Sequence, residues 1–382
     1  MRSLPWLLVV ASCTPIMPFQ PPPPQGLMCD RIVIPPGALE ASLKSATAGD
    51  CIILPSGTYS GSFVLPENVT LAASDGAMVI LTGGDPVLTV KGGSRSIVRD
   101  VRIVGGSGSG IAIEPGPVQL ISVAVTQSQR SAITATCSRP DCAEREIAMT
   151  DCEVTQSAVG LRVVGARVSV EGGRIAEQLG TSLSSGSGVV ASDGAAVTLR
   201  GVTIERNQNI GVLLDGAATR ATVDGCTIRE NTGRGLWAQG QTADAGVQTV
   251  TVTGGEISGN SLIGIGARDT SGLLIRQTRI LTTKAIRVPI DISTSEDIGD
   301  GIGLFTGTRA VTIEGVVAEN NARAQVLADG SGQGVTVSGT VSGGRFRVVV
   351  QRPVAPVMVE QALVDAPASE LLVRAAAIGL AP

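Results

Sequence analysis

Residues 202–213 read VTIERNQNIGVL, and residues 226–237 read CTIRENTGRGLW. Residues 152–163 (CEVTQSAVGLRV) and 256–265 (EISGNSLIGI) follow the same plan. Each begins with a short stretch of alternating apolar and polar residues. A polar residue, usually Asn or Gln, comes next, followed by Gly and a second alternating stretch. Alternation with a period of two predicts strands and not helices, so two strands joined by a polar turn recur along the chain.

The polar residue of each turn recurs at intervals in the twenties, which is the period of a solenoid. In a solenoid, each coil buries its inner face only by stacking on its neighbours. An inward-pointing amide at the turn can donate and accept hydrogen bonds along the stack, and so satisfies buried backbone groups. We therefore interpret this column as structural and not catalytic. It comprises Gln127, Gln156, Asn207, Asn231, Asn260 and Asn321.

The composition narrows the class of protein. With 43% hydrophobic and 16% charged residues, the 382-residue chain is too apolar to be disordered. No apolar run reaches the ~18 residues of a membrane span. The net charge of −4 leaves no basic excess, so we expect no nucleic-acid partner. Histidine is absent, which excludes Ser-His-Asp and Cys-His catalysis and every His-ligated metal site.

The N-terminus has the pattern of an export signal. Residues 1–13 read MRSLPWLLVVASC, with one positive charge, a short apolar stretch and small residues before a cysteine. Residues 10–13 resemble the lipobox of bacterial lipoproteins. This resemblance implies a signal peptide over residues 1–12, cleavage before Cys13, and acylation of Cys13 by several chains that anchor the protein stably in a membrane. An ordinary secretory signal with an incidental cysteine is the alternative.

Residues 13–30 are rich in proline, with an unbroken run from Pro21 to Pro24. Such a tract adopts the extended polyproline II conformation and acts as a semi-rigid tether. A tether directly after an anchor would lift the folded part of the chain away from the membrane. We therefore expect an exported protein that is lipid-anchored in the bacterial envelope, at the outer membrane or the cell surface.

Residues 38–61, ALEASLKSATAGDCIILPSGTYSG, resemble the opening of the pectin-lyase-like right-handed parallel β-helices. In that family a short capping helix leads to a Gly-Asp pair, an apolar strand and a Gly-Thr-Tyr turn. The resemblance implies an all-β, right-handed parallel β-helix over residues 31–350, and we expect residues 351–382 to form a C-terminal cap. It implies little about function, because lyases, hydrolases, epimerases and non-catalytic surface proteins share this scaffold.

An even number of cysteines follows Cys13, as is common in exported proteins with disulfides. Cys137 and Cys142 bracket a turn sequence, which predicts a local disulfide, and Cys29 with Cys51 is a second candidate pair. The paired CxxC spacing of a zinc cluster is missing.

In the β-helix, Cys152 and Cys226 share one column about three coils apart. That separation is ~14 Å, beyond the ~7 Å that a disulfide can span. We expect both to be buried free thiols that fill space in the core.

The longest interruption of the repeat lies between Leu281 and Phe305 and gathers two cations and four carboxylates. A calcium-dependent polysaccharide lyase would use such groups, with calcium holding the uronate while Arg or Lys removes the proton α to its carboxylate. In this alternative the catalytic candidates are Lys284, Arg287, Asp297 and Asp300. The calcium ligands would be Asp291, Glu296, Asp297 and Asp300.

Residues 299–308, GDGIGLFTGT, are similar to the Gly-Asp-Asp region of polygalacturonases. The second Asp of that pair is Gly301 here, the essential His of that family has no counterpart, and its Arg-Ile-Lys motif is missing. We therefore expect no polygalacturonase activity, and we favour a turn and a strand start at this position.

The remaining polar and aromatic residues carry weaker signals. We expect Glu205 and Arg206 on a solvated outer face of the coils. Trp237 could serve as a lone aromatic platform for a sugar ring, but we favour a packing role.

The sequence thus favours an envelope-anchored β-helix lipoprotein that binds or displays a polysaccharide or an envelope partner without catalysis and without a cofactor. The enzyme alternative adds calcium, and a purely structural spacer is a further alternative. An enzyme requires Lys284, Arg287 and the acids to converge in a groove, whereas a binding module requires a broad face without such convergence.

The lipobox makes the first prediction. Cys13→Ser should leave unprocessed or soluble protein in place of a membrane-associated form, because the acylated sulfur is lost. Membrane fractionation and mass spectrometry of the mature N-terminus measure this. An unmodified mature protein that begins elsewhere would contradict the anchor.

Overall fold

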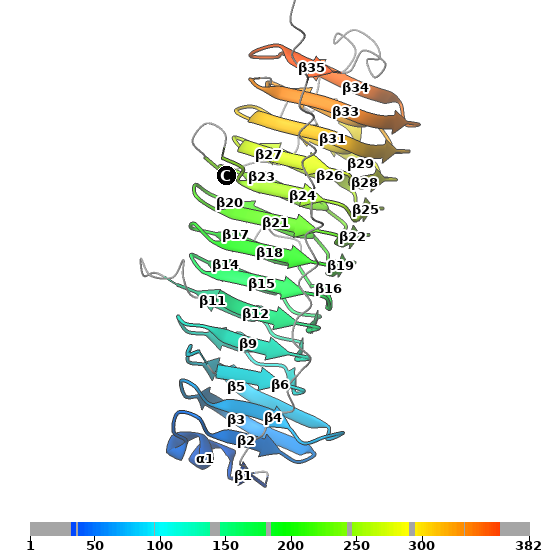
Figure 1. Ribbon diagram of the computed structural model, residues 1–382. Helices are drawn as coiled ribbons and strands as arrows, with labels where there is room; N and C mark the ends of the chain where they lie inside the picture. Colours follow the sequence, from blue (N-terminus) through cyan, green and yellow to red (C-terminus); the bar gives the residue numbers. More distant parts are fainter. Residues whose placement is uncertain are drawn as a thin grey trace, which may run out of the picture. The chain divides into compact units, whose positions relative to one another are not determined.

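The chain winds into a stack of coils whose strands pair in parallel with those of the coils before and after (Figure 1). This is the predicted parallel β-helix. The structure is a computed structural model, and it describes residues 32–35, 37–94, 96–137, 146–180, 185–242, 247–289, 295–331 and 333–359.

Three faces of strands run along the stack. The first face contains, in order, β1 (Ile32–Val33), β2 (Cys51–Leu54), β4 (Thr70–Ala73), β6 (Ser96–Arg99), β9 (Val118–Ile121), β12 (Glu146–Thr150), β15 (Arg167–Glu171), β18 (Ala196–Arg200), β21 (Arg220–Asp224), β24 (Val250–Thr253), β27 (Ser271–Arg276), β31 (Arg309–Glu319), β33 (Val335–Ser342) and β35 (Val357–Val359).

The second face begins with β3 (Gly57–Leu65) and β5 (Val79–Val90) and ends on the last residues of β31 and β33. Between them lie β7 (Arg102–Val104), β10 (Ala124–Thr126), β13 (Glu153–Thr155), β16 (Arg174–Ala176), β19 (Thr203–Glu205), β22 (Thr227–Arg229), β25 (Glu256–Ser258) and β28 (Arg279–Leu281).

The third face begins on the last residues of β3 and β5. It continues through β8 (Ile111–Ile113), β11 (Ser131–Thr136), β14 (Val159–Val164), β17 (Ser187–Ser192), β20 (Val212–Asp215), β23 (Leu236–Gln239), β26 (Leu262–Arg268), β30 (Ser295–Leu304), β32 (Ala324–Asp329) and β34 (Phe346–Gln351). One further strand, β29 (Ile286–Pro289), pairs antiparallel with β30.

The helix α1 (Leu39–Ser45) closes the N-terminal end of the stack, as the sequence predicts. Its buried residues Leu39 and Leu43 are four apart, so they lie on one face of the helix and join the main core. That core is built almost wholly of inward Val, Ile, Leu and Ala side chains, one or two from most strands and three or more from the long strands β3, β5 and β31. Alternation along each strand directs the remaining side chains outward.

A polar ladder runs inside the turn between the second and third faces. The backbone N–H of Asn207 donates to Oδ1 of Asn231 at 3.1 Å, and that of Asn231 donates to Oδ1 of Asn260 at 3.0 Å. Further along the stack, the N–H of Thr283 donates to Oδ1 of Asn321. The N–H of Gln178 donates to Oδ1 of Asn207 in the same way. Each of these four asparagines thus satisfies a buried N–H of the preceding coil, which is the structural role that we predicted for them.

The prediction was wrong by one residue at Gln127 and Gln156. Both side chains are exposed, and both residues have a positive φ, 62° and 51°. The ladder instead runs through the next residues: the N–H of Ser128 donates to Oγ of Ser157 at 3.0 Å, and the N–H of Ser157 donates to Oε1 of Gln178 at 2.9 Å. Each turn has one residue in the left-handed conformation directly before the ladder position. Gln127 and Gln156 take that left-handed position, so the ladder residue is the serine that follows.

Glycine follows the ladder residue because the next coil's amide needs the space. A Cβ on Gly211 would lie 2.5 Å from the carbonyl oxygen of Gly235 and 2.9 Å from Nδ2 of Asn231. A Cβ on Gly235 would meet Nδ2 of Asn260 at the same distance. The Asn of one coil therefore requires the Gly of the coil before it, because the amide occupies the space that a Cβ would fill.

The strand register supports the prediction for two cysteines. Successive pairings of β13, β16, β19 and β22 place Cys152 and Cys226 three coil steps apart, and both are buried and free. Burial raises the pKa of the Cys152 thiol to about 11, so the thiolate is scarce at neutral pH.

Cys51 and Cys137 are each in a disulfide. Their predicted partners, Cys29 and Cys142, lie outside the described residues, so these pairings stay predictions. Strands continue to Val359, nine residues past the expected end of the solenoid at residue 350. Cys13 and the last part of the expected cap, residues 360–382, also lie outside the described residues. In the part of the chain that is described, no helix is long and apolar enough to cross a membrane.

The polar ladder makes the second prediction. Asn231→Leu should destabilise the fold by about 1–3 kcal/mol, because the buried N–H of Asn207 loses its acceptor. Asn209→Leu is the matched control, since Asn209 is half-buried and its side chain lies outside the ladder. Thermal or denaturant unfolding measures both. Equal shifts for the two variants would contradict the register described here.

Candidate functional site

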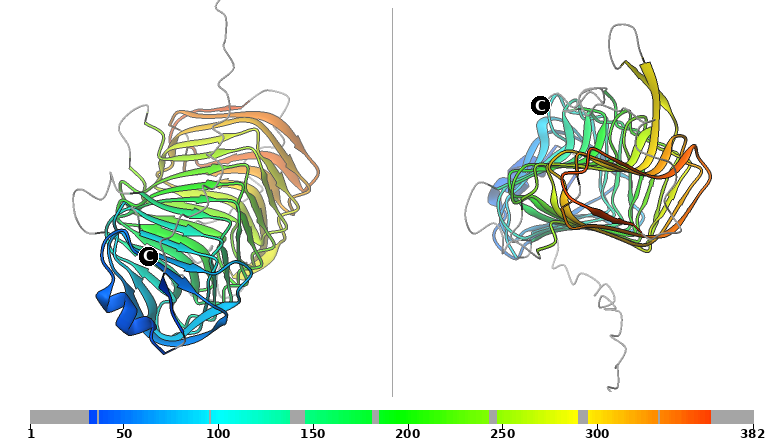
Figure 2. Two further views of the ribbon diagram at one scale, coloured as in Figure 1. Left: turned by 60° about the horizontal axis from the view of Figure 1, so that its bottom comes forward. Right: turned by 90° about the horizontal axis from the view of Figure 1, so that it is seen from above.

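The predicted site between Leu281 and Phe305 is a β-hairpin. Seen along the axis of the stack, β29 and the first part of β30 project from the outline of the coils (Figure 2). Arg287 pairs across the hairpin with Asp297, both are exposed, and Arg287 donates to Oγ of Ser295 at 2.6 Å. Lys284 is exposed at the base of the hairpin, and Asp291 lies outside the described residues.

The acids of this hairpin are held by an arginine that the sequence did not single out. Asp300 is fully buried and accepts hydrogen bonds from two nitrogens of Arg323, with Nε at 2.8 Å. Glu296 lies 3.4 Å from a third nitrogen of the same guanidinium. Burial alone would lower the pKa of Arg323, but the charges and hydrogen bonds of Asp300 and Glu296 outweigh it and raise that pKa.

This arrangement differs from the calcium site and the lyase site that we considered. Asp300 and Glu296 converge on Arg323, while Asp297 is exposed on the hairpin, opposite Arg287 in the strand register. The described residues contain no group of three or more Cys, His, Asp or Glu side chains that could hold a metal ion. The acids bind a buried cation of the protein itself, and they thereby fasten β30 to the next coil.

The same geometry explains the departure from the polygalacturonase motif at Gly301. A Cβ there would lie 2.6 Å from Nδ2 of Asn321, the ladder amide of the next coil. Gly301 is thus the ladder glycine of its coil, and an aspartate at this position would collide with the ladder.

A second candidate lies on the outer side of the third face. Alternation directs Ala112, Thr134 and Arg162 outward from β8, β11 and β14, where they are paired in register. Two shallow hollows of about 390 and 440 Å³ lie around them, and a third of about 510 Å³ lies beside these at the turns that lead into β11 and β14. The first two share Thr134, and the last two share Gln129 and Ala158. They therefore form one groove across the coils.

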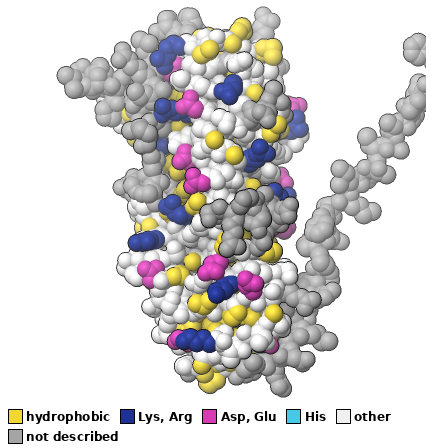
Figure 3. All heavy atoms as spheres, turned by 90° about the vertical axis from the view of Figure 1, so that its left-hand side faces the viewer, with side chains coloured by type: hydrophobic (Ala, Val, Ile, Leu, Met, Phe, Trp, Pro, Cys, Tyr) yellow, Lys and Arg dark blue, Asp and Glu magenta, His cyan; other side chains and the backbone are white. Residues whose placement is uncertain are grey.

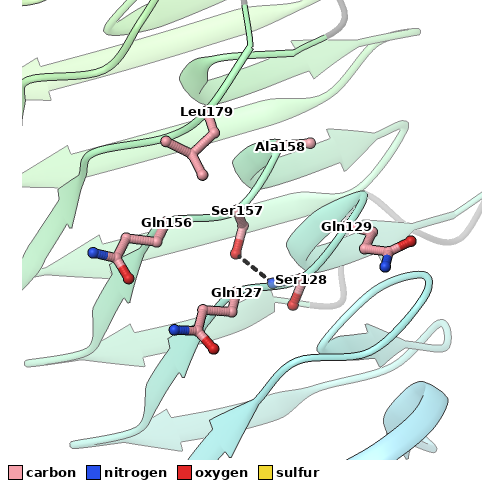
Figure 4. Close-up of a pocket in the computed structure, with 7 residues that line it drawn as sticks. All are labelled: Gln127, Ser128, Gln129, Gln156, Ser157, Ala158 and Leu179. Carbon is pink, nitrogen blue, oxygen red and sulfur yellow. Dashed lines mark hydrogen bonds between the residues drawn. The ribbon is translucent and has the colours of Figure 1, made fainter.

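The groove is lined by hydrogen-bonding groups of several kinds. Figure 4 shows its largest hollow, where the amides of Gln127 and Gln156 lie side by side on successive coils and Gln129 lies at the opposite side. Leu179, 49% exposed, adds an apolar surface. The adjoining hollow contributes the guanidinium groups of Arg130 and Arg162. Amides, hydroxyls and guanidinium groups beside an apolar patch can bind a hydroxyl-rich ligand.

Sequence reasoning named Gln127 and Gln156 but gave them an inward role, and it missed Gln129, Arg130 and Arg162. The alternation of the strand could have identified Arg162. It is the polar residue of an otherwise apolar strand, so its side chain must point outward.

Glu205 also departs from expectation, since it is 3% exposed and not solvated. It accepts from Nε of Arg174 and of Arg229, each at 2.8 Å, and lies 2.9 Å from Arg206. Burial acts to raise the pKa of Glu205, but the hydrogen bonds and charges of these arginines outweigh it and lower that pKa. Elsewhere on the surface, acidic and basic side chains are interspersed (Figure 3).

Trp237 is 1% exposed, so it is no open platform for a sugar ring. Its ring lies 5.8 Å from that of Phe305, and the guanidinium of Arg234 stacks 4.5 Å from its centre. The favoured packing role agrees with this burial.

Comparison with known proteins agrees with the fold. A family model described as a right-handed beta helix region matches residues 86–249 and 185–342. No curated protein sequence matches the chain.

Among solved structures, the chain is similar to an alginate lyase from Paenibacillus sp. (16% identity, TM-score 0.46, 65% of this chain and 95% of that one). It is also similar to the A-module of a mannuronan C-5 epimerase from Azotobacter vinelandii (15% identity, TM-score 0.42, 83% and 94%). A polygalacturonase from Erwinia carotovora matches at 9% identity and a TM-score of 0.41, over 88% and 96%. At these identities the likeness concerns the fold alone.

The ion pairs of Glu205 make the third prediction. A carboxylate with a lowered folded pKa contributes stability that is present above its unfolded pKa of about 4.3 and is lost as the pH falls through the folded pKa. Glu205→Gln should therefore lower Tm at pH 7 and reduce the loss of Tm between pH 5 and pH 3. Calorimetry across this range measures both effects. Glu171→Gln, at an exposed glutamate, should follow the parent protein, and the same pH profile in all three proteins would refute the assignment.

Proposed function

We propose that this chain, which belongs to the right-handed β-helix family, binds a polysaccharide without cleaving it, as a lipid-anchored protein of the bacterial envelope. The observation that carries the proposal is the groove of three adjoining hollows on the outer side of β8, β11 and β14 and at the turns that lead into β11 and β14. Its shape is open and shallow, as a site must be to accept a chain that continues in both directions.

The chemistry of the groove supports a carbohydrate ligand. The Gln127 and Gln156 amides lie on successive coils, so they repeat at the ~4.8 Å spacing of the strands. Each amide both donates and accepts, which suits the hydroxyls of a sugar. Arg130 and Arg162 add donors that favour a carboxylate or another acidic group, and Leu179 offers an apolar contact for a ring face.

Binding without turnover is proposed because the acids with the best claim to catalysis are engaged elsewhere. Asp300 and Glu296 hold Arg323 within the fold. Anchoring is proposed from the lipobox and the proline-rich tether, which together would hold the groove away from a membrane surface.

Affinity electrophoresis and calorimetric titration with alginate, polygalacturonate and dextran provide the fourth test. The parent protein should bind at least one of them. Arg162→Ala should weaken binding about ten- to a hundredfold, because a hydrogen bond to a charged group contributes ~1.5–3 kcal/mol. The double variant Gln127→Ala/Gln156→Ala should weaken it further than either single change.

Gln119→Ala is the matched control, since Gln119 is an exposed glutamine of the first face, in β9. It should bind like the parent protein. Equal losses in the control and the groove variants, or no binding to any of the three polymers, would refute the groove. Release of shortened or unsaturated products would refute the non-catalytic role.

A further inference from the structure

The hollows that make up the groove differ in charge. Glu114 is the only charged residue among the described residues that line the hollow of about 390 Å³. Arg130 and Arg162 are the only charged ones among those that line the adjoining hollow of about 440 Å³. These two hollows meet at Thr134, and the third is lined by no charged residue that the structure describes. The groove therefore has an acidic part and a basic part.

The strand register separates the two parts along the stack. Arg162 is in register with Thr134 and Ala112, so it lies two coil steps from β8, which is ~10 Å at ~4.8 Å a coil. Glu114 directly follows β8, two residues beyond Ala112, which adds ~7 Å along the strand. The backbone positions of Glu114 and Arg162 are thus about 12 Å apart. Charges at such a separation interact weakly, because the Debye length in physiological salt is ~8 Å.

The carboxylate of Glu114 is available to a ligand. Glu114 is exposed, and no ion pair joins it to another residue in the described part of the chain. Two further charges lie one coil earlier: Asp85 is in β5, and Lys91 directly follows β5 as Glu114 follows β8. Their charges are opposite and offset each other. Glu114 therefore sets the sign of the charge at this end of the groove.

The basic part is suited to an acidic group. Arg130 is exposed, and Arg162 is half-buried. Nε of Arg162 donates to Oγ of Ser131 at 3.3 Å, which holds this guanidinium beside the hollow. A guanidinium binds carboxylate and phosphate groups through parallel hydrogen bonds, and two of them on one hollow attract such a group from both sides.

We propose, resting on the polysaccharide-binding function proposed above, that the ligand carries amino sugars and acidic sugars close together on one chain. An unacetylated amine, protonated to an ammonium group, binds the carboxylate of Glu114. The acidic group of a nearby sugar binds the guanidinium groups of Arg130 and Arg162. The hydroxyl of Thr134, which lies 3.0 Å from that of Ser109, offers a hydrogen-bonding group between the two parts.

The same pattern disfavours chains with one kind of charge or none. A polymer of acidic sugars alone brings carboxylates against Glu114, and a polymer of amino sugars alone brings ammonium groups against Arg130 and Arg162. A neutral polymer gains from neither part. A chain with both groups meets an opposite charge at each part, so the groove discriminates by repulsion as well as by attraction.

Hyaluronan and N-deacetylated hyaluronan are a matched pair of probes. Both alternate a uronate with an amino sugar, and they differ in whether the amine is acetylated. Calorimetric titration compares them at a pH above the pKa of the carboxylates and below that of the amine. The parent protein should bind the deacetylated polymer about three- to fivefold more tightly, as one ion pair open to solvent allows.

Substitutions in the groove should change this preference selectively. Glu114→Gln should abolish it, because a neutral amide does not attract an ammonium group more than an acetamide. Glu114→Arg should reverse it in favour of intact hyaluronan. Arg162→Ala should weaken binding of both polymers and keep the preference. Glu171→Gln is the matched control, since Glu171 is an exposed glutamate of the first face, and it should behave like the parent protein.

Two kinds of failure can be told apart. Equal binding of the two hyaluronans by the parent protein, or a preference that survives Glu114→Gln, overturns the amino-sugar ligand and leaves a polysaccharide groove in place. If neither hyaluronan binds, and alginate, polygalacturonate and dextran do not bind either, the proposed function fails together with this ligand. Far-ultraviolet circular dichroism confirms that the variants remain folded.

Discussion

Each coil of this protein obtains its backbone hydrogen-bond partners from the coils on either side, and the rest of the structure depends on that requirement. Strands meet it by parallel pairing, but turns cannot, because their N–H groups point into the stack without a strand opposite. The polar ladder supplies side-chain oxygens as acceptors for these N–H groups, as where Asn231 accepts from Asn207. A left-handed residue before the ladder and a glycine after it follow from this one need.

The repeat could therefore be predicted from the sequence with some precision, and the ladder asparagines Asn207, Asn231 and Asn260 were placed correctly. Gln127 and Gln156 were misplaced because an amide is equally suited to the ladder and to the exposed left-handed position before it. A serine takes the ladder position in those coils, and the hydroxyl of Ser157 accepts from the N–H of Ser128 as an asparagine oxygen would. Composition alone does not separate two adjacent positions with the same preference for polar residues.

The site was harder to predict, because charged residues on different coils become neighbours through the period of the winding. Arg323 lies more than twenty residues from Asp300 in sequence, yet the next coil places it against that carboxylate. Glu205 meets Arg174 and Arg229 in the same way, one coil before and one coil after. Such partners become visible only when the register between coils is known, and local charge patterns are therefore poor guides to exposure in a solenoid.

The contact between each ladder amide and the glycine of the coil before it also constrains how this chain can evolve. The contact repeats by simple translation along the axis, as in the pairs Gly211–Asn231 and Gly235–Asn260. Duplicating or deleting one whole period, wherever its ends fall, leaves every amide opposite a glycine. A gain or loss of part of a period sets an amide against a side chain. The molecule can thus lengthen in units of one coil. A smaller insertion within the ladder turn has to leave the stack and return before the glycine, as the β29–β30 hairpin does between Thr283 and Gly301.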